Sequence, residues 1–303
     1  MDSQNRVGVV TVAFNSGGVL TDFLRCLGKQ THGNFLLFVV DNSSNDDTLA
    51  ILDAWGDERL RIIANSQNKG VAEGNNQGIQ KALEEGCSSV LLINNDTEFA
   101  PTLIADLLTG LNAYQSDMTC PKMMYFDEPH LIWAAGGRFL PWLGYTAIQF
   151  GEGRPDRGQH NYGRFVTYVP TCCVLIRKAV FETIGLMDQR YFVYVDDVDF
   201  MYRAMRSGLK LRYLPEATLL HKVGRLTGGG NSPFATRFGT RNRLFFLLKH
   251  FGLLPTVPWM IFCEVIWFFR SLVRRDGIRW FYAKHLALRE SLHMWTSSRQ
   301  SSD

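Results

Sequence analysis

Three aspartates, Asp196, Asp197 and Asp199, occupy four consecutive positions in the segment YVDDVDF at residues 194–200. Like charges this close disfavour each other's ionised forms, so solvent, a cation or a helix N-terminus must offset the repulsion. Apolar side chains recur at helical spacing over residues 198–209, which places the first two aspartates just before a helix body. The helix dipole at that end would stabilise the ionised carboxylate that a general base needs.

Two other titratable residues have simple structural explanations. Asp199 lies four residues before Arg203, a spacing that predicts an ion pair on the helix surface. His221 follows the apolar run ATLL and precedes VGRLTGGG, which we expect to be a flexible loop. A single histidine in such a setting is more often a hydrogen-bonded core residue than a ligand, so the local sequence alone favours the core interpretation.

Polar side chains also follow strand-like segments, the positions where α/β proteins bind ligands. They lie in VVDNSSNDD at 39–47, NKGVAEGNNQG at 68–78 and LLINNDTEF at 91–99. Asp41 and Asp96 could instead cap helices, and the glycine-rich segment could be a tight turn. GVAEGNNQG does not match the dinucleotide fingerprint and no GK[ST] occurs, so the sequence indicates neither a Rossmann cofactor nor a Walker phosphate loop.

Strand-like and helix-like segments alternate over the first part of the chain. Apolar, β-rich runs lie at residues 7–14, 35–40, near 62 and at 90–93. Helical spacing of apolar residues lies between them, at residues 20–27, 48–55 and 75–85. This alternation predicts an α/β fold with a mostly parallel central sheet flanked by helices.

The alternation stops after the first hundred or so residues. Residues 133–168 are rich in glycine, aromatic residues and arginine without clear periodicity, so we expect loops and short antiparallel strands beside the sheet. Two further short strands are predicted at 211–214 and 217–220.

Composition restricts the class of protein. The 303 residues are 46% hydrophobic and 20% charged, as in an ordinary globular protein. A net charge of +3 is too small to suggest nucleic-acid binding. The six cysteines show no CxxC spacing, which favours core thiols in a reducing compartment. The segment MDSQNRVGVVTVAF lacks the features of a signal peptide, so we expect the protein to stay in the cytosol.

The C-terminal part differs in charge and aromatic content. We expect a catalytic domain over residues 1–235 and a helical, basic and aromatic extension over 236–303. From residue 233 onward there are 11 Lys/Arg and 4 Asp/Glu, which makes this part +7 and the remainder −4. Residues 251–269 have about the length of a membrane span but contain Pro255 and Pro258, so a clean span is not expected.

Arginines and tryptophans follow that apolar segment closely. Arg270, Arg274, Arg275 and Arg279 lie near three tryptophans, a composition typical of a segment in the headgroup region of an anionic membrane. The favoured interpretation is therefore association with a membrane surface. The alternatives are helices packed on the catalytic domain or on a second subunit, as in a homodimer, and a true span.

Six segments in order resemble the inverting family 2 glycosyltransferases of the GT-A fold, across residues 6–230, and look most like the bacterial rhamnosyltransferase-like branch. The segments are VTVAFNS, VVDNSSNDDT, NKGVAEGNNQG, LLINNDTEF, LIRKAVFETIGLMDQRYFVYVDDVDFMYRAMRSG and LLHKVGRLTGG. The resemblance implies a GT-A fold and sugar transfer from a nucleotide donor.

The resemblance also implies a nucleotide-sugar site on the matched segments. Asp41 would hydrogen-bond the pyrimidine base. The segment around Asn68, Gly70 and Asn75 would lie against the nucleotide. The other expected donor-binding positions are Thr11, Asn15, Asn94 and Asn95.

For the metal, the resemblance implies Asp96 as a ligand of a divalent cation, Mg²⁺ or Mn²⁺. His221 matches the position of a second metal ligand in many relatives, which reverses the core interpretation of this residue. One or two protein ligands suffice for Mg²⁺ when a diphosphate and water supply the rest. Mn²⁺ would tolerate an imidazole better.

For catalysis, the resemblance implies that Asp197 is the base that deprotonates the acceptor hydroxyl. That oxygen then attacks the anomeric carbon as the nucleoside diphosphate leaves from the opposite face, which inverts the configuration. Asp196 would raise the basicity of its neighbour and could bind a hydroxyl group.

Three positions depart from the family pattern. Asn94 stands where many relatives have an acid, so metal affinity is expected to be modest. Thr171 stands where glycine is frequent, and Asp196 stands where glutamate is commoner. Both changes would reshape the acceptor side.

The sequence and the resemblance therefore predict a metal-dependent inverting transferase that moves L-rhamnose from dTDP-L-rhamnose to a lipid-linked saccharide acceptor in bacterial cell-surface polysaccharide synthesis. Its expected partners are a dTDP- or UDP-linked donor, an oligosaccharide or lipid-linked acceptor and the cytoplasmic face of the inner membrane, but no nucleic acid. The alternatives are a UDP-hexose-using relative and a catalytically silent sugar-nucleotide binder or membrane scaffold. A nucleotidyltransferase would need a basic glycine-rich motif that VTVAFNSGG lacks.

Overall fold

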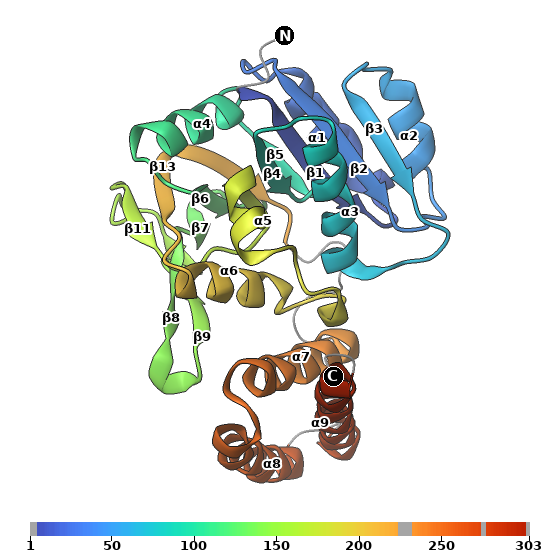
Figure 1. Cartoon of the computed structure of the whole chain (residues 1–303), viewed down its shortest axis with the longest axis vertical. Helices are drawn as coiled ribbons and strands as arrows, with labels where there is room; N and C mark the ends of the chain where they lie inside the picture. The colour runs from blue at the N-terminus through green and yellow to red at the C-terminus, as the bar shows by residue number, and fades with distance from the viewer. Residues whose placement is uncertain (1–4, 224–231, 274–276, 301–303) are drawn as a thin grey trace. The chain divides into compact units, whose positions relative to one another are not determined.

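The structure is a computed structural model that describes residues 5–223, 232–273 and 277–300 (Figure 1). The chain divides into two compact units. The sheet unit comprises Met1–Phe192 and Asp197–Leu226, and the helical unit comprises Val193–Asp196 and Thr227–Asp303. The sheet unit has the α/β architecture that the sequence predicts.

The first half of the sheet unit alternates strands and helices as expected. Its parallel strands, in the spatial order β3-β2-β1-β4, are β1 (Val7–Ala13), β2 (Phe35–Asp41), β3 (Leu60–Ala64) and β4 (Ser89–Ile93). The connecting helices are α1 (Gly17–Gly28), α2 (Thr48–Trp55) and α3 (Gly70–Glu84). All five residues of β4 are buried, as a strand covered on both faces requires. The carboxyl ends of these parallel strands meet at one edge of the sheet.

Helix α3 begins earlier than the sequence predicts. We expected residues 68–78 to be a loop and the helix to start near 75, but α3 starts at Gly70. Glycine is a poor helix former, and here close packing overrides that preference. A Cβ atom on Gly74 would lie 2.8 Å from a methyl group of Val12, and one on Gly78 would lie 2.3 Å from a methyl group of Val10. The glycines therefore let α3 approach β1 closely.

The second half of the sheet unit adds antiparallel pairs. Strand β12 (Cys173–Arg177) is antiparallel to β4 and to β6 (Met118–Tyr125). Strand β13 (Leu211–His221) is parallel to β6 and antiparallel to β5 (Thr97–Phe99). The remaining helices of this half are α4 (Leu103–Ala113), α5 (Lys178–Ile184) and α6 (Asp196–Arg206), with short 3-10 turns η2 (Pro141–Leu143) and η3 (Gln189–Tyr191).

The prediction of two short strands at 211–214 and 217–220 is wrong. Strand β13 runs through both, with a register shift against β6 between Leu214 and Thr218. Pro215 lies in this interval and lacks a backbone N–H, so it interrupts the hydrogen-bonded ladder without ending the strand.

Short antiparallel strands fill the region around residues 133–168, as the sequence predicts. They are β7 (Leu131–Ala134), β8 (Gly137–Leu140), β9 (Thr146–Gln149), β10 (Arg154–Pro155) and β11 (Arg164–Val166). Strands β8 and β9 form a separate two-stranded sheet, drawn in light green in Figure 1. A single bridge between Gly137 and Tyr168 links this hairpin to the following segment.

The helical unit contains α7 (Pro233–Phe251), α8 (Leu253–Val273) and α9 (Gly277–Gln300). Its core is built on Leu244, Leu248 and Met260, which are buried. Partly buried residues pack against them: Trp259, Trp267, Leu288, Leu292 and Trp295.

Prolines do not break the apolar segment, contrary to expectation. Helix α8 runs through both Pro255 and Pro258. Pro255 lies in the first turn, where a helical N–H has no intrahelical partner, so the missing donor costs little. Pro258 lies further inside the helix, where Met260 packs into the core of the unit and supports the segment.

Helix α8 keeps most of its large apolar side chains exposed. Val257, Ile261, Val265, Phe268 and Leu272 follow helical spacing and are between 38% and 66% exposed. We call these five residues the α8 stripe. Within the described ranges, α8 is the one helix long and apolar enough to cross a membrane, and 17% of its most apolar window is buried.

The six cysteines are free, as the sequence predicts. Burial raises the pKa of the thiols of Cys120 and Cys173, which keeps them protonated at neutral pH. They are core residues without the exposed, low-pKa environment of a reactive cysteine.

Candidate active site

Several buried polar atoms at the carboxyl edge of the sheet lack a hydrogen-bond partner within the described part of the chain. They are Thr11 Oγ1, Asp41 Oδ1, Asn95 Oδ1, Asp96 Oδ1 and His221 Nδ1. Leaving a buried polar group unpaired costs ~1–3 kcal/mol, so their concentration at one edge calls for an explanation. A bound polar ligand would supply the missing partners. We call these five atoms the unpaired rim.

Asp41 ends β2 and faces a loop held by cross-links to the end of β1. One carboxylate oxygen of Asp41 accepts a hydrogen bond of 3.2 Å from the Ser44 amide. The Ser44 hydroxyl accepts from the Asn15 amide at 2.9 Å, and the Asn15 side chain accepts from the Asn45 amide at 2.8 Å. The N-cap of α2 is Asp47, so the alternative that Asp41 caps this helix is wrong.

Asp96 and His221 lie side by side at the ends of β4 and β13. Asp96 Oδ1 is 3.2 Å from His221 Nε2, and both side chains are 7% exposed. The rings of His221 and Trp133 make a T-shaped contact at a centroid distance of 4.3 Å. Asp96 is followed by strand β5 and not by a helix, so it is not a helix cap.

The neighbourhood of His221 is tightly fixed. Lys222, the next residue, is buried and its Nζ lies 2.7 Å from both Asp22 and Glu98. Burial opposes a charge on His221, while the side chains of Cys172 and Asp96 raise the pKa of the imidazole. The pair is therefore a carboxylate and an imidazole held close together in a buried position.

These two side chains fit a divalent cation as a partial ligand set. Within the described residues, no group of three or more His, Cys, Asp and Glu side chains could hold a metal alone. His221 Nδ1 is buried and lacks a hydrogen bond, and the neighbour of the buried Asp96 Oδ1 is His221 Nε2 at 3.2 Å. A carboxylate with one imidazole suits Mn²⁺ or Mg²⁺ when substrate phosphates supply the remaining oxygens.

Asp197 lies in the first turn of α6 and both of its carboxylate oxygens are hydrogen-bonded. Oδ2 accepts from the Tyr168 hydroxyl at 2.8 Å, and Oδ1 accepts from the Val198 amide at 2.8 Å. The side chain is partly buried. This burial raises the pKa of Asp197, while the hydrogen bonds from Tyr168 and the backbone lower it. A raised pKa suits a carboxylate that accepts a proton.

The backbone before Asp197 is strained. Phe192, Tyr194 and Val195 have positive φ angles of 64°, 64° and 67°. Such conformations cost ~1–3 kcal/mol each in residues other than glycine, and they cluster at functional sites. Within the helical unit, Asn242 Nδ2 donates to the carbonyls of Val193 and Tyr194 at 2.7 and 2.9 Å. Helix α7 therefore holds the turn that leads directly to Asp196, which is itself buried.

Asp199 is not the surface residue that the sequence predicts. Its ion pair with Arg203 exists at 2.9 Å, but the Asp199 side chain is 0% exposed. Tyr191 donates a second hydrogen bond to Asp199 at 3.1 Å. Arg203 also donates to the carbonyl of Leu186 at 2.7 Å. The pair is thus a buried link between α6 and the preceding loop.

The expected nucleotide-binding residues near α3 have packing roles in the structure. Asn68 is exposed and accepts a hydrogen bond of 2.8 Å from the Gly70 amide. Gly70 has φ of +84°, and a Cβ there would lie 2.4 Å from the Phe192 carbonyl oxygen. Asn75 is buried beside the sulfur of Met187. Asn94 is exposed, whereas Asn95 is buried and donates to the Val12 carbonyl at 3.1 Å.

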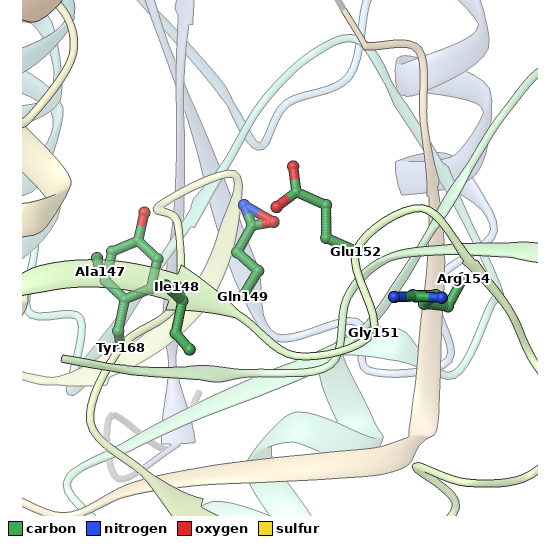
Figure 2. Close-up of a pocket in the computed structure, with 7 residues that line it drawn as sticks. All are labelled: Ala147, Ile148, Gln149, Gly151, Glu152, Arg154 and Tyr168. Atoms are coloured by element: carbon green, nitrogen blue, oxygen red, sulfur yellow. The ribbon is translucent and has the colours of Figure 1, made fainter. Parts of the chain in front are cut away.

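A cavity of about 440 Å³ lies beside the Asp197 carboxylate, because Tyr168 lines it and also bonds Asp197. Figure 2 shows the tips of Tyr168, Gln149 and Glu152 pointing to the same side, with Arg154 at the other end of the cavity. Gln149 Oε1 is buried and has no hydrogen-bond partner among the described residues. The cavity thus offers a phenol, an amide, a carboxylate and a guanidinium, a set that suits sugar hydroxyl groups.

Sequence reasoning missed Tyr168 and Asn242. Tyr168 contacts Asp197 across 29 residues, and Asn242 contacts Tyr194 across 48. Neither lies in a motif with recognisable spacing. The available signals were weak: an aromatic residue in a region without periodicity, and an asparagine between two arginines of a predicted helix.

Comparison with known proteins identifies the family to which the sheet unit is similar. A family model described as glycosyl transferase family 2 matches residues 8–185. A dTDP-rhamnosyl transferase, RfbF, from Shigella flexneri is 23% identical over 239 residues, covering 76% of each chain. An N-acetylglucosaminyl-diphospho-decaprenol L-rhamnosyltransferase from Mycobacterium tuberculosis is 24% identical over 316 residues, covering 97% of this chain and 94% of the relative.

Solved structures share the fold. GalNAc-T7, crystallised with UDP, GalNAc and Mn²⁺, superposes with a TM-score of 0.62 at 17% identity over 81% of this chain. The match covers 47% of GalNAc-T7, so this chain spans about half of its length. Residues 1–349 of S. aureus TarS in complex with UDP superpose with a TM-score of 0.57 at 15% identity, covering 99% of this chain and 92% of that one.

Proposed function

Because the chain belongs to glycosyl transferase family 2, we propose that it transfers L-rhamnose from dTDP-L-rhamnose to a lipid-linked saccharide, with inversion at the anomeric carbon. Two relatives with these substrate names, the Shigella and Mycobacterium enzymes, support the choice of donor and acceptor. The product would serve cell-surface polysaccharide synthesis on the cytoplasmic face of the membrane.

The observation that carries the proposal is the placement of Asp197. One of its oxygens accepts from a phenol that also lines an open cavity, and the other accepts from a backbone amide. A carboxylate held in this way is oriented but keeps lone pairs for a further proton donor. A catalytically silent binding protein would have no need for such an arrangement beside a cavity.

The transfer follows from the roles of these groups. Asp197 takes the proton of an acceptor hydroxyl as the acceptor oxygen forms a bond to the anomeric carbon. The bond from that carbon to the diphosphate oxygen breaks, and the nucleoside diphosphate leaves from the opposite face with the electron pair. Asp196, the adjacent buried carboxylate, would disfavour further negative charge nearby and so raise the affinity of Asp197 for the proton.

The donor site is built on the unpaired rim. Asp41 Oδ1 and Thr11 Oγ1 would bind polar groups of the nucleotide, and Asn95 Oδ1 would bind a donor hydroxyl. Asn15, Asn68, Gly70, Asn75 and Asn94 would complete the donor site, as the family resemblance implies. Each buried rim atom then regains a hydrogen bond that the protein alone does not provide.

Asp96 and His221 would hold a divalent cation, Mn²⁺ or Mg²⁺, beside the donor diphosphate. When bound, such a cation supplies positive charge that stabilises the leaving diphosphate. The short distance between the two side chains and their buried position support this assignment. A relative by fold, GalNAc-T7, was crystallised with Mn²⁺.

The cavity in Figure 2 would hold the acceptor saccharide. Glu152 accepts hydrogen bonds from sugar hydroxyls, Arg154 donates to ring or hydroxyl oxygens, and the amide of Gln149 can do both. Tyr168 lies between this cavity and Asp197, so an acceptor bound here would approach the base.

The α8 stripe would lie in the surface of an anionic membrane and bring the enzyme to its lipid-linked acceptor. The stripe is apolar and exposed, and Arg270 and Arg279 flank it in the basic C-terminal part. An apolar helical face next to arginines is typical of interfacial helices. A second copy of the chain would cover the stripe without lipid, and sedimentation of the lipid-free protein distinguishes the two by its mass.

Incubation of the purified chain with a lipid-linked acceptor and a panel of nucleotide sugars tests the proposal. We expect sugar transfer from dTDP-L-rhamnose with release of an equal amount of dTDP, and inverted configuration in the product. Rejection of a donor that only adds a hydroxyl group is limited to about a hundredfold in an apolar pocket, so weak turnover of UDP-hexoses is compatible. A clear preference for a UDP-hexose would overturn the donor and retain the reaction class.

A further inference from the structure

A second cavity lies within the helical unit, and Arg270, which flanks the α8 stripe, is one of its lining residues. Its volume is about 470 Å³. It is lined by three cationic side chains and three indoles, Arg243, Arg270, Lys284, Trp259, Trp267 and Trp280. No carboxylate occurs among the described residues that line it. A cavity with this lining carries a net positive charge.

One of its cationic side chains, Lys284, is held in place. Lys284 Nζ donates to the Thr240 hydroxyl at 2.6 Å and lies 5.3 and 5.4 Å from the ring centres of Trp267 and Trp280. Cation–π contacts of this kind orient an ammonium group without neutralising it. Thr240 itself is buried and also lines the cavity.

The nearby carboxylates pair with other residues. Glu264 is 3.1 Å from His285 Nδ1, and Glu290 is 2.5 Å from Arg237. Neither glutamate lines the cavity. Among the described residues that line the cavity, the charged side chains are Arg243, Arg270 and Lys284, so an anion that enters would meet donors of one charge sign.

We propose that this cavity binds a phosphate or diphosphate ester. A phosphate offers several oxygens to guanidinium and ammonium donors, and arginine matches its geometry well. The three indoles provide an apolar wall for the carbon chain attached to the phosphate. The ester is either that of a lipid at the membrane surface or that of a soluble compound. This binding needs neither a sugar donor nor transfer, so it stands apart from the proposed function.

Tryptophan fluorescence of the whole chain measures the binding. Inorganic pyrophosphate should change the emission with a saturable dependence. The double substitution Arg243→Gln and Lys284→Gln should weaken binding about tenfold or more, because two charge-assisted contacts are lost. Arg289→Gln is the matched control, since Arg289 is an exposed cation on the same helix outside the cavity, and it should leave binding unchanged.

Vesicles identify the source of the phosphate. Phosphatidylcholine vesicles with phosphatidic acid carry a phosphate monoester, and those with phosphatidylglycerol carry a diester at matched surface charge. Stronger binding to phosphatidic acid, with competition by pyrophosphate, indicates a lipid phosphate. Saturable pyrophosphate binding without that preference indicates a soluble phosphate. No pyrophosphate binding, or equal binding by the double variant, overturns the proposal.

A measurement on the unsubstituted protein covers the case in which the double variant does not fold. Cys263 lines the same cavity, so a bound pyrophosphate should slow its alkylation by N-ethylmaleimide. Peptide mass spectrometry follows that residue separately from the other cysteines. An alkylation rate at Cys263 that pyrophosphate leaves unchanged contradicts the proposal.

Discussion

The sheet unit and the helical unit differ in which groups the protein leaves without a suitable environment. In the sheet unit, strands such as β4 bury every residue, while the carboxyl edge leaves buried polar atoms without partners. In the helical unit, the α8 stripe leaves large apolar side chains in water. Unpaired polar atoms call for a polar ligand, and exposed apolar atoms call for an apolar phase. This difference supports the proposal that the two units bind different partners, a nucleotide sugar and a membrane.

Asp197→Asn should remove catalysis from the sheet unit with the largest effect on rate. Turnover should fall by about a hundredfold or more, because the acceptor hydroxyl loses its base. Donor binding should stay close to that of the original chain. Steady-state kinetics and calorimetric titration with the donor nucleotide measure the two quantities.

Asp53→Asn is the matched control, since Asp53 is an exposed carboxylate on α2 of the same unit. It should leave turnover unchanged. Equal losses in both variants would remove Asp197 from its assigned role.

Asp199→Asn should lower the stability of the fold and should not act directly on the reaction. Asp199 is fully buried and paired with Arg203, and breaking a buried pair costs roughly 3–5 kcal/mol in the free energy of unfolding. Chemical denaturation measures this quantity. Glu182→Gln is the control, because Glu182 forms an exposed pair with Lys178 at the same i,i+4 spacing and should lose at most about 1 kcal/mol. Similar losses of unfolding free energy in the two variants would mean that burial of the Asp199 pair does not contribute to stability.

Asp96→Ala tests the metal-binding role of the unpaired rim. Binding of the donor nucleotide should weaken about tenfold or more in the presence of Mn²⁺, because a charged ligand to the cation is lost. In the original chain, a chelator should abolish transfer and added Mn²⁺ or Mg²⁺ should restore it. The variant should bind nucleotide equally with and without chelator. Full activity of the original chain in chelator would exclude the metal assignment.

Tyr168→Phe should have the smallest effect, and it depends on pH. The Tyr168 hydroxyl stabilises ionised Asp197 and lowers its pKa, so removing the hydroxyl raises that pKa further. A base must be deprotonated to act, so the acidic limb of the profile of kcat/KM against pH should move to higher pH. Activity at alkaline pH should change little.

Tyr114→Phe is the comparison, since Tyr114 is an exposed phenol of the same unit whose ring packs under Arg212. Its profile should match that of the original chain. A Tyr168→Phe profile that does not move would place the proton acceptor elsewhere.

The sequence predicts the regular parts of the sheet unit well. The alternation from β1 to β4 and the bounds of α2, Thr48–Trp55, follow from apolar periodicity, which is a local property. Helix α3 was misjudged at its start because glycine disfavours helices locally, whereas its contact with β1 requires glycine. Strand β13 was split in two because Pro215 resembles an end of a strand.

The site could be predicted only in part. Asp197 and Asp96 stand in recognisable segments, but the phenol that bonds Asp197 comes from a region without periodicity. The spacing of Asp199 and Arg203 predicts their ion pair and says nothing about burial, which depends on Tyr191 and the loop before it. Contacts between distant residues depend on tertiary packing, and a single sequence does not encode that packing in any local pattern.

We assign the chemistry to the sheet unit and membrane binding to the helical unit. The most direct test of this assignment compares two acceptors in two variants. Transfer is measured to a lipid-linked acceptor in anionic vesicles and to a short water-soluble analogue of it. The double substitution Ile261→Glu and Phe269→Glu places charges on exposed positions of α8 that are 60% and 62% accessible. We expect this variant to lose transfer in vesicles and to keep transfer to the soluble acceptor, whereas Asp197→Asn should lose both. Equal loss on the two acceptors in the α8 variant, or full activity in vesicles, would contradict the assignment of chemistry to one unit and membrane binding to the other.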